Sequence, residues 1–162
     1  MKISTLFLTA LTVIFFTNAS ASNGKQDTKI DNYEFIWKLG DISSTSIQLR
    51  ASEDGVFYNL TGRISNVTLS PDEMASIIDR VSDINALSNE LAKSGEINEK
   101  HGRRTLIVQN HPERGFQLRI QSGMTDVVIF SRGETSKLVE IVGMKSIEQA
   151  AKLRQRLSSA FD

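Results

Sequence analysis

Large apolar residues recur at every second position early in the chain, as in a strand with one buried face. Tyr33, Phe35, Trp37 and Leu39 follow this period of two. Aromatic side chains on one face of a strand usually belong to a core, because they bury a large apolar area. We therefore expect this stripe to pack inside the protein. A cavity for a ligand beside Tyr33, Phe35 and Trp37 is the alternative.

More strands are expected before residue 70. The turn-forming segment Ser52-Glu53-Asp54-Gly55 contains an Asp-Gly pair, which is a strong signal for a hairpin. Strand-like residues surround it and continue after Gly62, so that we expect further strands over residues 47–51, 56–61 and 64–69.

A helical period replaces the strand pattern after residue 70. Ser70 followed by Pro71 and by Glu73 is typical of a helix start with a capping box. Apolar residues then recur at helical spacing until Gly95, the expected stop: Met74, Ile77, Ile78, Val81, Ile84, Leu87 and Leu91. One long helix is therefore predicted. Its polar side carries an acidic face that we expect to be solvated: Asp72, Asp79, Asp83 and Glu90.

The second half of the chain is predicted to be an antiparallel meander that ends in a helix. Residues 96–104 are mostly charged and are expected to be a connector. Short glycine-containing turns then separate four expected strands, over residues 106–110, 116–121, 126–131 and 137–142. Ser146 and Gln149 indicate a second capping box, which opens a C-terminal helix with a basic outer face. The two halves share a coarse plan of strands followed by a helix, but we find no residue-level repeat between them.

The register of one hairpin follows from its apolar pattern. A loop from His111 to Gly115 places Val108 opposite Leu118, and it puts the apolar residues of both strands on one face. A loop shorter by one residue would place apolar side chains opposite polar ones, so the five-residue loop is favoured.

These elements predict an α+β fold. We expect a mostly antiparallel sheet of about seven strands, including the C-terminal meander, with a long central helix and a C-terminal helix packed on one face. Nothing in the composition divides the chain, so residues 33–162 are expected to form a single domain.

The first 21 residues have the layout of a cleaved secretory signal peptide. Lys2 precedes an apolar run that ends near Phe16, and small residues lead to Ala21, after which we expect cleavage. The polar segment 22–32 is expected to be a flexible leader. The mature protein is therefore predicted to be periplasmic or secreted, with no stable membrane anchor after cleavage.

Composition narrows the possible chemistry. The chain has no cysteine, which excludes disulfides, thiol catalysis and cysteine-ligated metals. Its 19 basic and 19 acidic residues balance, and nucleic-acid binding needs an excess of basic side chains. We expect no cofactor and no metal.

Two polar segments are the candidate binding sites. His101, Arg103 and Arg104 form a basic cluster that could hold an anion, although a solvated connector is the favoured interpretation.

The second candidate is the hairpin loop that holds His111, Glu113 and Arg114, and a simple bend is again favoured. The two histidines lie at opposite ends of a strand, roughly 20 Å apart, so they are not expected to share a metal or a substrate.

The leading hypothesis is a non-catalytic binding protein of the bacterial envelope. Its expected partner is another envelope or secreted protein, with an inhibitor, immunity or chaperone-like accessory role. A carrier of small apolar ligands is the alternative, and a hydrolase that uses His111 and Glu113 ranks last. The sequence leaves the oligomeric state and the order of the strands open.

Overall fold

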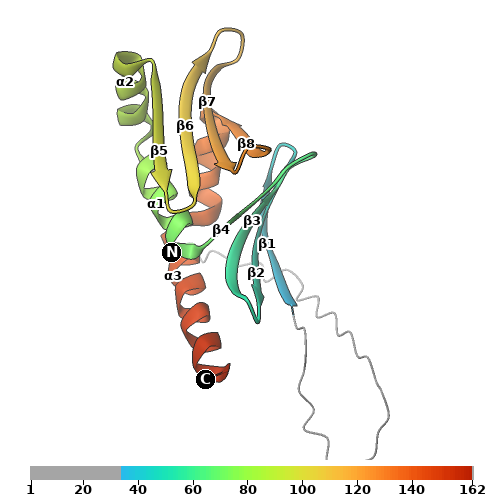
Figure 1. Ribbon diagram of the computed structural model, residues 1–162. Coiled ribbons are helices and arrows are strands. Elements are labelled where there is room, and N and C mark those ends of the chain that lie inside the picture. The colour runs from blue at the N-terminus through green and yellow to red at the C-terminus, as the bar shows by residue number, and fades with distance from the viewer. Residues whose placement is uncertain (1–33, 162) are drawn as a thin grey trace, which may run out of the picture.

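The computed structural model describes residues 34–161, which form two antiparallel sheets of four strands and the helices that follow them (Figure 1). Sheet A contains β1 (Glu34–Ile42), β2 (Thr45–Ser52), β3 (Gly55–Thr61) and β4 (Asn66–Leu69), in that order. Sheet B contains β5 (Glu96–His101), β6 (Arg104–His111), β7 (Gly115–Ser122) and β8 (Asp126–Ser131), also in order. The expected signal peptide, the leader and Tyr33 lie outside the described residues.

The helices follow the sheets in the chain. Helices α1 (Pro71–Ser82) and α2 (Ile84–Ser94) come after sheet A, and α3 (Arg132–Phe161) comes after sheet B. Helix α3 contains a break at Gly143, whose φ and ψ are 49° and 161°. Each half of the chain is therefore a four-stranded meander followed by an interrupted helical segment, which agrees with the coarse plan expected from the sequence and adds the equal number of strands.

The α+β class is confirmed, whereas the predicted single sheet of about seven strands is wrong. Residues 96–104 are not a connector: they contain β5, a turn and the start of β6. In β5 only Ile97 is buried, while Glu96, Asn98 and Lys100 are exposed on the other face. The strand was missed because an edge strand with one apolar residue carries almost no periodic signal.

The strand predicted over residues 137–142 is also wrong, because these residues belong to α3. Leu138 and Val142 are buried, whereas Lys137 and Glu140 are exposed, which is the spacing of a helix face. The start of α3 is marked instead by Ser131 and Glu134. The backbone N–H of Ser131 donates to Glu134 Oε2 at 2.8 Å.

The predicted long helix is two helices. Its start is confirmed: Ser70 and Glu73 form the capping box. Its stop is confirmed as well, since Gly95 has φ 78° and its N–H donates to the Leu91 carbonyl at 2.8 Å. Asp83, however, has non-helical φ and ψ of −97° and 82°, and its side chain caps α2 by accepting the N–H groups of Asn85 and Ala86. Helical periodicity continues across such a break, so it hid the interruption.

The predicted register of the β6–β7 hairpin is confirmed. Val108 lies opposite Leu118 and Gln109 lies opposite Gln117, with His111 paired to Gly115. In sheet A, Ser52 is paired to Gly55 across the expected tight turn.

One hydrophobic cluster joins both halves. Buried side chains from both sheets and from α1, α2 and α3 all belong to it. Helices α1 and α3 pack against each other, and each contacts strands of both sheets, so the expected segregation onto one face of a single sheet is replaced by a shared helical layer (Figure 1). No helix within residues 34–161 is long and apolar enough to cross a bilayer.

Each half also holds a hairpin of the other half at its helix start. Glu73 Oε2 accepts the N–H of Ser70, while Glu73 Oε1 accepts the N–H of Arg103 in the β5–β6 turn at 2.8 Å. Glu134 repeats the arrangement: Oε2 accepts the N–H of Ser131, and Oε1 accepts the hydroxyl of Ser43 in the β1–β2 turn. Two capping glutamates thus tie the halves together.

Candidate functional site

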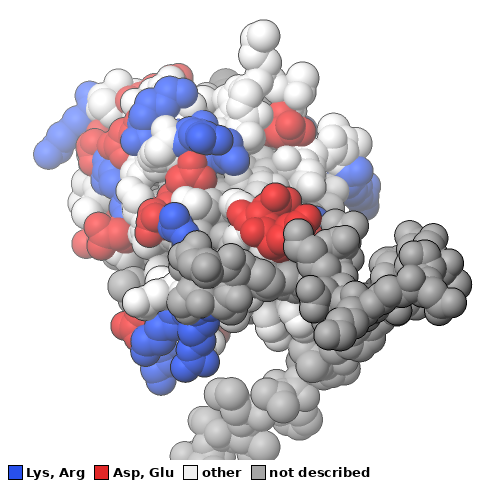
Figure 2. Space-filling view, turned by 60° about the horizontal axis from the view of Figure 1, so that its bottom comes forward, with Lys and Arg blue, Asp and Glu red and all other residues white. Residues whose placement is uncertain are grey.

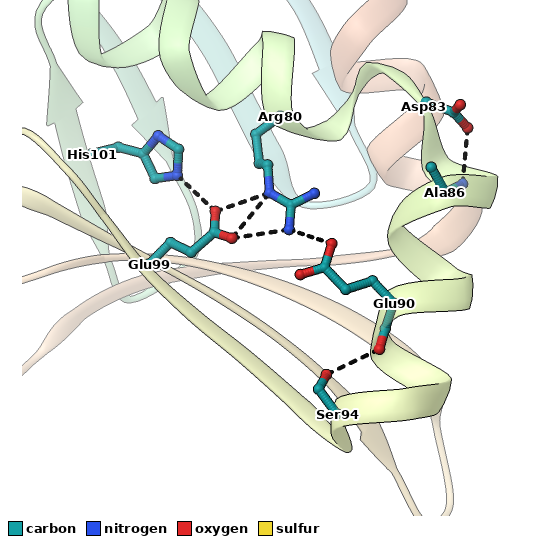
Figure 3. A network of polar contacts seen from close by, with 7 residues as sticks. All are labelled: Arg80, Asp83, Ala86, Glu90, Ser94, Glu99 and His101. Atoms are coloured by element: carbon teal, nitrogen blue, oxygen red, sulfur yellow. Dashed lines mark hydrogen bonds and ion pairs between the residues drawn. The ribbon is translucent and has the colours of Figure 1, made fainter.

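A polar network joins α1, α2 and β5 (Figure 3). Arg80 Nε donates to both carboxylate oxygens of Glu99, at 3.1 and 2.9 Å. Arg80 Nη2 donates to Glu99 at 2.9 Å and to Glu90 at 2.7 Å. One guanidinium from α1 therefore fastens β5 and α2 through two carboxylates.

The charges of this network reinforce one another. The hydrogen bonds from Arg80 lower the pKa of Glu99 below its usual range. The carboxylates of Glu99 and Glu90 raise the pKa of Arg80 in turn. Both partners are charged at neutral pH, so the network is a charge-assisted contact between elements.

His101 extends the network toward Ser76. The His101 side chain is only 9% exposed, and its Nε2 lies 3.3 Å from Glu99 Oε2. Its Nδ1 lies 2.7 Å from the Ser76 hydroxyl oxygen. Because the carboxylate can only accept, the neutral ring carries its hydrogen on Nε2, and Nδ1 accepts from Ser76.

The contact order serine, imidazole, carboxylate is that of a serine hydrolase, but the surroundings differ. Ser76 lies inside α1, where the neighbouring backbone N–H groups bond within the helix and cannot stabilise an oxyanion. Glu99 is also held by Arg80. The arrangement suits the attachment of β5 to α1.

The structure brings His101, Arg103 and Arg104 together at the β5–β6 turn, next to acidic and carbonyl partners. Arg104 Nε donates to the Thr68 carbonyl at 2.6 Å and lies 3.9 Å from Glu73 Oε2. Arg104 and His101 are half-buried, whereas Arg103 is exposed. Two of the three basic groups are therefore engaged by the protein itself.

The second candidate segment lies at the far end of β6. The N–H of Glu113 donates to His111 Nδ1 at 3.2 Å, which closes the loop. Glu113 and Arg114 are exposed at its tip. The structure does not bring this loop and the His101 cluster together, because β6 runs from Arg104 to His111 between them.

The aromatic stripe lies on β1. Phe35 and Trp37 are half-buried, pack against the core and stack with ring centroids 6.0 Å apart. A shallow pocket lies elsewhere, between α1 and α3, where Asp72 and Arg154 form an ion pair at 3.0 Å. Its lining does not include the aromatic stripe.

Two apolar side chains that the sequence did not single out are exposed. Ile64 in the β3–β4 turn is 100% exposed, and Met124 in the β7–β8 turn is 97% exposed. They occupy corresponding turns of the two halves, and we call them the turn-tip pair. A single large apolar residue among polar turn residues was the available signal.

The β3–β4 turn is joined to β8, the strand that follows the β7–β8 turn. The Ser65 hydroxyl, next to Ile64, donates to the Val127 carbonyl at 2.6 Å. Val127 follows Met124 by three residues in the chain. Since a chain spans at most ~3.6 Å per residue, the Cα atoms of Ile64 and Met124 lie within roughly 22 Å of each other.

Within residues 34–161, no group of three or more histidine, aspartate or glutamate side chains could hold a metal ion. Comparison with known protein families and with characterised proteins gives no match to this chain.

Proposed function

We propose that this protein is a non-catalytic binding protein of the bacterial envelope that recognises another protein through the turn-tip pair. The observation that supports this proposal is the near-complete exposure of Ile64 and Met124, on corresponding turns of two halves that the Ser65–Val127 hydrogen bond links. Burying such a side chain in an interface stabilises the complex by about 1.5–3 kcal/mol. Methionine is enriched in the core of protein interfaces, where it adapts to the partner's shape.

The charge distribution supports a protein partner. Basic and acidic side chains are mixed over much of the face in Figure 2, and the whole chain has a formal net charge of zero. A nucleic acid would need a continuous basic surface. Arg63 is exposed beside Ile64 and would lie at the polar rim of the interface.

The test starts from the mature protein as bait in an envelope extract, followed by purification of the captured partner. Binding is then measured for a double variant, Ile64→Ser with Met124→Ser. We expect its dissociation constant to rise by at least about 100-fold, since two apolar side chains no longer become buried.

Two control variants separate this surface from the other candidates. Arg103→Ala tests the β5–β6 turn, and Glu113→Ala with Arg114→Ala tests the hairpin loop. Both are expected to bind with affinity close to that of the wild type. The proposal fails if the turn-tip variant binds normally or if a control variant loses binding as strongly.

A carrier of small apolar ligands is the weaker proposal. Half-buried Phe35 and Trp37 would have to line its cavity, and Trp37 is the single tryptophan of the chain. Quenching of tryptophan fluorescence by fatty acids or aromatic compounds would favour the carrier, and a flat titration would dismiss it. A hydrolase that uses His111 and Glu113 stays the last proposal, and full activity of His111→Ala in an ester and glycoside screen would end it.

A further inference from the structure

Strand β1 has an outer edge that faces away from α1 and α3 (Figure 1). β2 pairs with its other edge. Among residues 34–161, no strand pairs with the outer edge of β1. Such an edge presents backbone donors and acceptors that can pair with another strand.

The regular part of this edge is short. The β1–β2 register runs without interruption from Glu34 to Lys38 and then shifts between Lys38 and Gly40. A bulge of this kind twists the strand and ends regular pairing. Any strand that adds to this edge is therefore aligned mainly with residues 34–38.

The segment from Glu34 to Lys38 is complementary to its own reverse, because its two ends carry opposite charges and its three middle residues are apolar. It consists of an acid, an aromatic residue, Ile36, a second aromatic residue and a base. An antiparallel pair of two such segments, centred on Ile36, places Glu34 opposite Lys38 twice and Phe35 opposite Trp37 twice. Opposite charges and aromatic side chains are favourable cross-strand pairs.

We propose that the outer edge of β1 pairs antiparallel with β1 of a second copy of this protein, about a twofold axis at Ile36. The two copies of sheet A then form one continuous sheet. The same patch meets itself, which is the geometry of a twofold symmetric dimer.

Charge selects this arrangement over its competitors. A parallel pairing in register would bring Glu34 near Glu34 and Lys38 near Lys38, which is repulsive. A shift of one residue would place Glu34 opposite Trp37 and lose both ion pairs. In the antiparallel pairing centred on Ile36, each charged residue lies opposite an unlike charge and each apolar residue lies opposite an apolar one.

Burial supports the same edge. Ile36 is 40% exposed, one of the few large apolar side chains on the surface of the described residues. Phe35 and Trp37, on the other face, are half-buried although they pack against the core. A neighbouring strand would cover Ile36 on one face and the aromatic rings on the other.

The existing ion pairs of these residues do not oppose the pairing. Glu34 contacts Arg50, and Lys38 contacts Asp41 at 2.6 Å. The Glu34 and Arg50 side chains are 44% and 36% exposed, and those of Lys38 and Asp41 are 59% and 52% exposed, so both pairs contribute little and can be shared or exchanged.

The first experiment is sedimentation of the mature protein from low micromolar to several hundred micromolar concentration. We expect a monomer–dimer equilibrium. Lys38→Glu alone and Glu34→Lys alone each place like charges opposite each other, so each raises the dissociation constant by about tenfold or more. An equimolar mixture of the two variants restores the dimer, because unlike charges meet again at both positions.

The second experiment compares Ile36→Lys with Ile129→Lys. Ile129 on β8 is 43% exposed, so it is a matched control on the other sheet. Ile36→Lys brings two ammonium groups together at the twofold axis and is expected to abolish the dimer, whereas Ile129→Lys leaves it intact. Circular dichroism confirms that both variants are folded, and Trp37 emission reports the burial of the edge as concentration rises.

Three results would overturn the proposal: a wild-type protein that is monomeric throughout the concentration range, a dimer unaffected by Lys38→Glu and Ile36→Lys, or a mixture that dimerises no better than its components. If the outer edge of β1 pairs with a foreign peptide and not with a second copy, the wild-type protein alone stays monomeric, which is the first of these results. The dimer edge and the turn-tip pair use different residues, so this test is independent of the proposed function.

Discussion

At the residue scale, each of the two capping glutamates accepts hydrogen bonds from both halves of the protein. Glu73 accepts the N–H groups of Ser70 and Arg103, which belong to different halves of the protein. The Ser43 hydroxyl and the Ser131 N–H together lower the pKa of Glu134 below its usual range. A single carboxylate thus fixes both the start of a helix and the position of a distant turn.

Gly102 shows how closely one of these carboxylates is enclosed. Its φ is 62°, and a Cβ added there would lie 2.8 Å from Glu73 Cγ and Oε1. Gly102→Ala should therefore lower the free energy of unfolding by about 1–2 kcal/mol for the left-handed backbone, and by about 1–2 kcal/mol more for displacing Glu73. Urea unfolding of this variant measures the sum of the two losses.

Gly115→Ala is the matched control for this prediction. Gly115 has φ 68°, and an added Cβ would meet nothing within 4 Å. This variant should show the backbone cost alone. Equal losses for the two variants would mean that Glu73 moves aside without penalty.

Part of this residue-scale picture could be predicted from sequence. The spacing of Ser70 and Glu73 gave the capping box, which is a local contact. The second oxygen of Glu73 bonds to Arg103, 30 positions further along the chain, and no local pattern encodes that contact. For the same reason His101 looked like a basic site, although its ring contacts Ser76 on α1, 25 positions earlier in the chain.

At the element scale, both helical segments are interrupted at corresponding places. Asp83 caps α2 with its own side chain, with Oδ1 3.1 Å from the N–H nitrogen of Asn85 and 2.9 Å from that of Ala86. Gly143 interrupts α3. Each interruption lets a helical segment change direction and follow the core.

Asp83→Ala is expected to destabilise the protein by about 1 kcal/mol, because the first N–H groups of α2 lose their acceptor. The loss should be visible as a lower midpoint of urea unfolding. Asp79→Ala removes an exposed carboxylate from α1 without removing a cap, and should change stability by less than about 0.5 kcal/mol. A smaller loss for Asp83→Ala than for Asp79→Ala would contradict the cap.

The attachment of β5 should depend on pH. Glu99 has a lowered pKa in the folded protein, so its stabilising effect is complete above its ordinary value near 4.5 and is lost as pH falls through the lower folded value. Glu99→Gln should therefore flatten the decline of unfolding free energy between about pH 5 and pH 3. If the unfolding free energies of the variant and the wild type fall in parallel with pH, Arg80 does not favour the charged form of Glu99.

The elements themselves were predictable only where their pattern was local and periodic. Hairpins with turn residues, such as the one closed by His111 and Gly115, were placed in the correct register. β5 was missed because its own sequence has almost no strand pattern, and the strand forms by pairing with β6. The start of α3 was misread as strand because Val139 and Ile141 are β-branched, and tertiary packing overrides that preference.

At the scale of the whole molecule, the two halves share one hydrophobic core. Their cores merge into one hydrophobic cluster, and each half holds the first hairpin of the other. The sequence indicated strands followed by a helix in each half but no residue-level repeat, because the similarity of the halves lies in the order and pairing of elements rather than in residue identity.

This organisation should appear in native-state hydrogen exchange. Amides of the β1–β2 turn are expected to exchange together with those at the start of α3, and amides of the β5–β6 turn with those at the start of α1. Glu134→Ala should speed exchange in the β1–β2 turn while leaving the β5–β6 turn protected. Independent exchange of the turns and helix starts would show that the capping contacts do not couple the halves.

Each helix start secures a hairpin of the other half, and this determines what happens when the chain is divided. A cut after Gly95 separates two fragments, each with a helix start that has lost the hairpin it normally secures and a hairpin that has lost its support. Each fragment carries the hairpin that the helix start of the other fragment secures. Co-expressed fragments should therefore find each other and rebuild the native body without a covalent link, which would make this protein a split scaffold whose reassembly is directed by two glutamates.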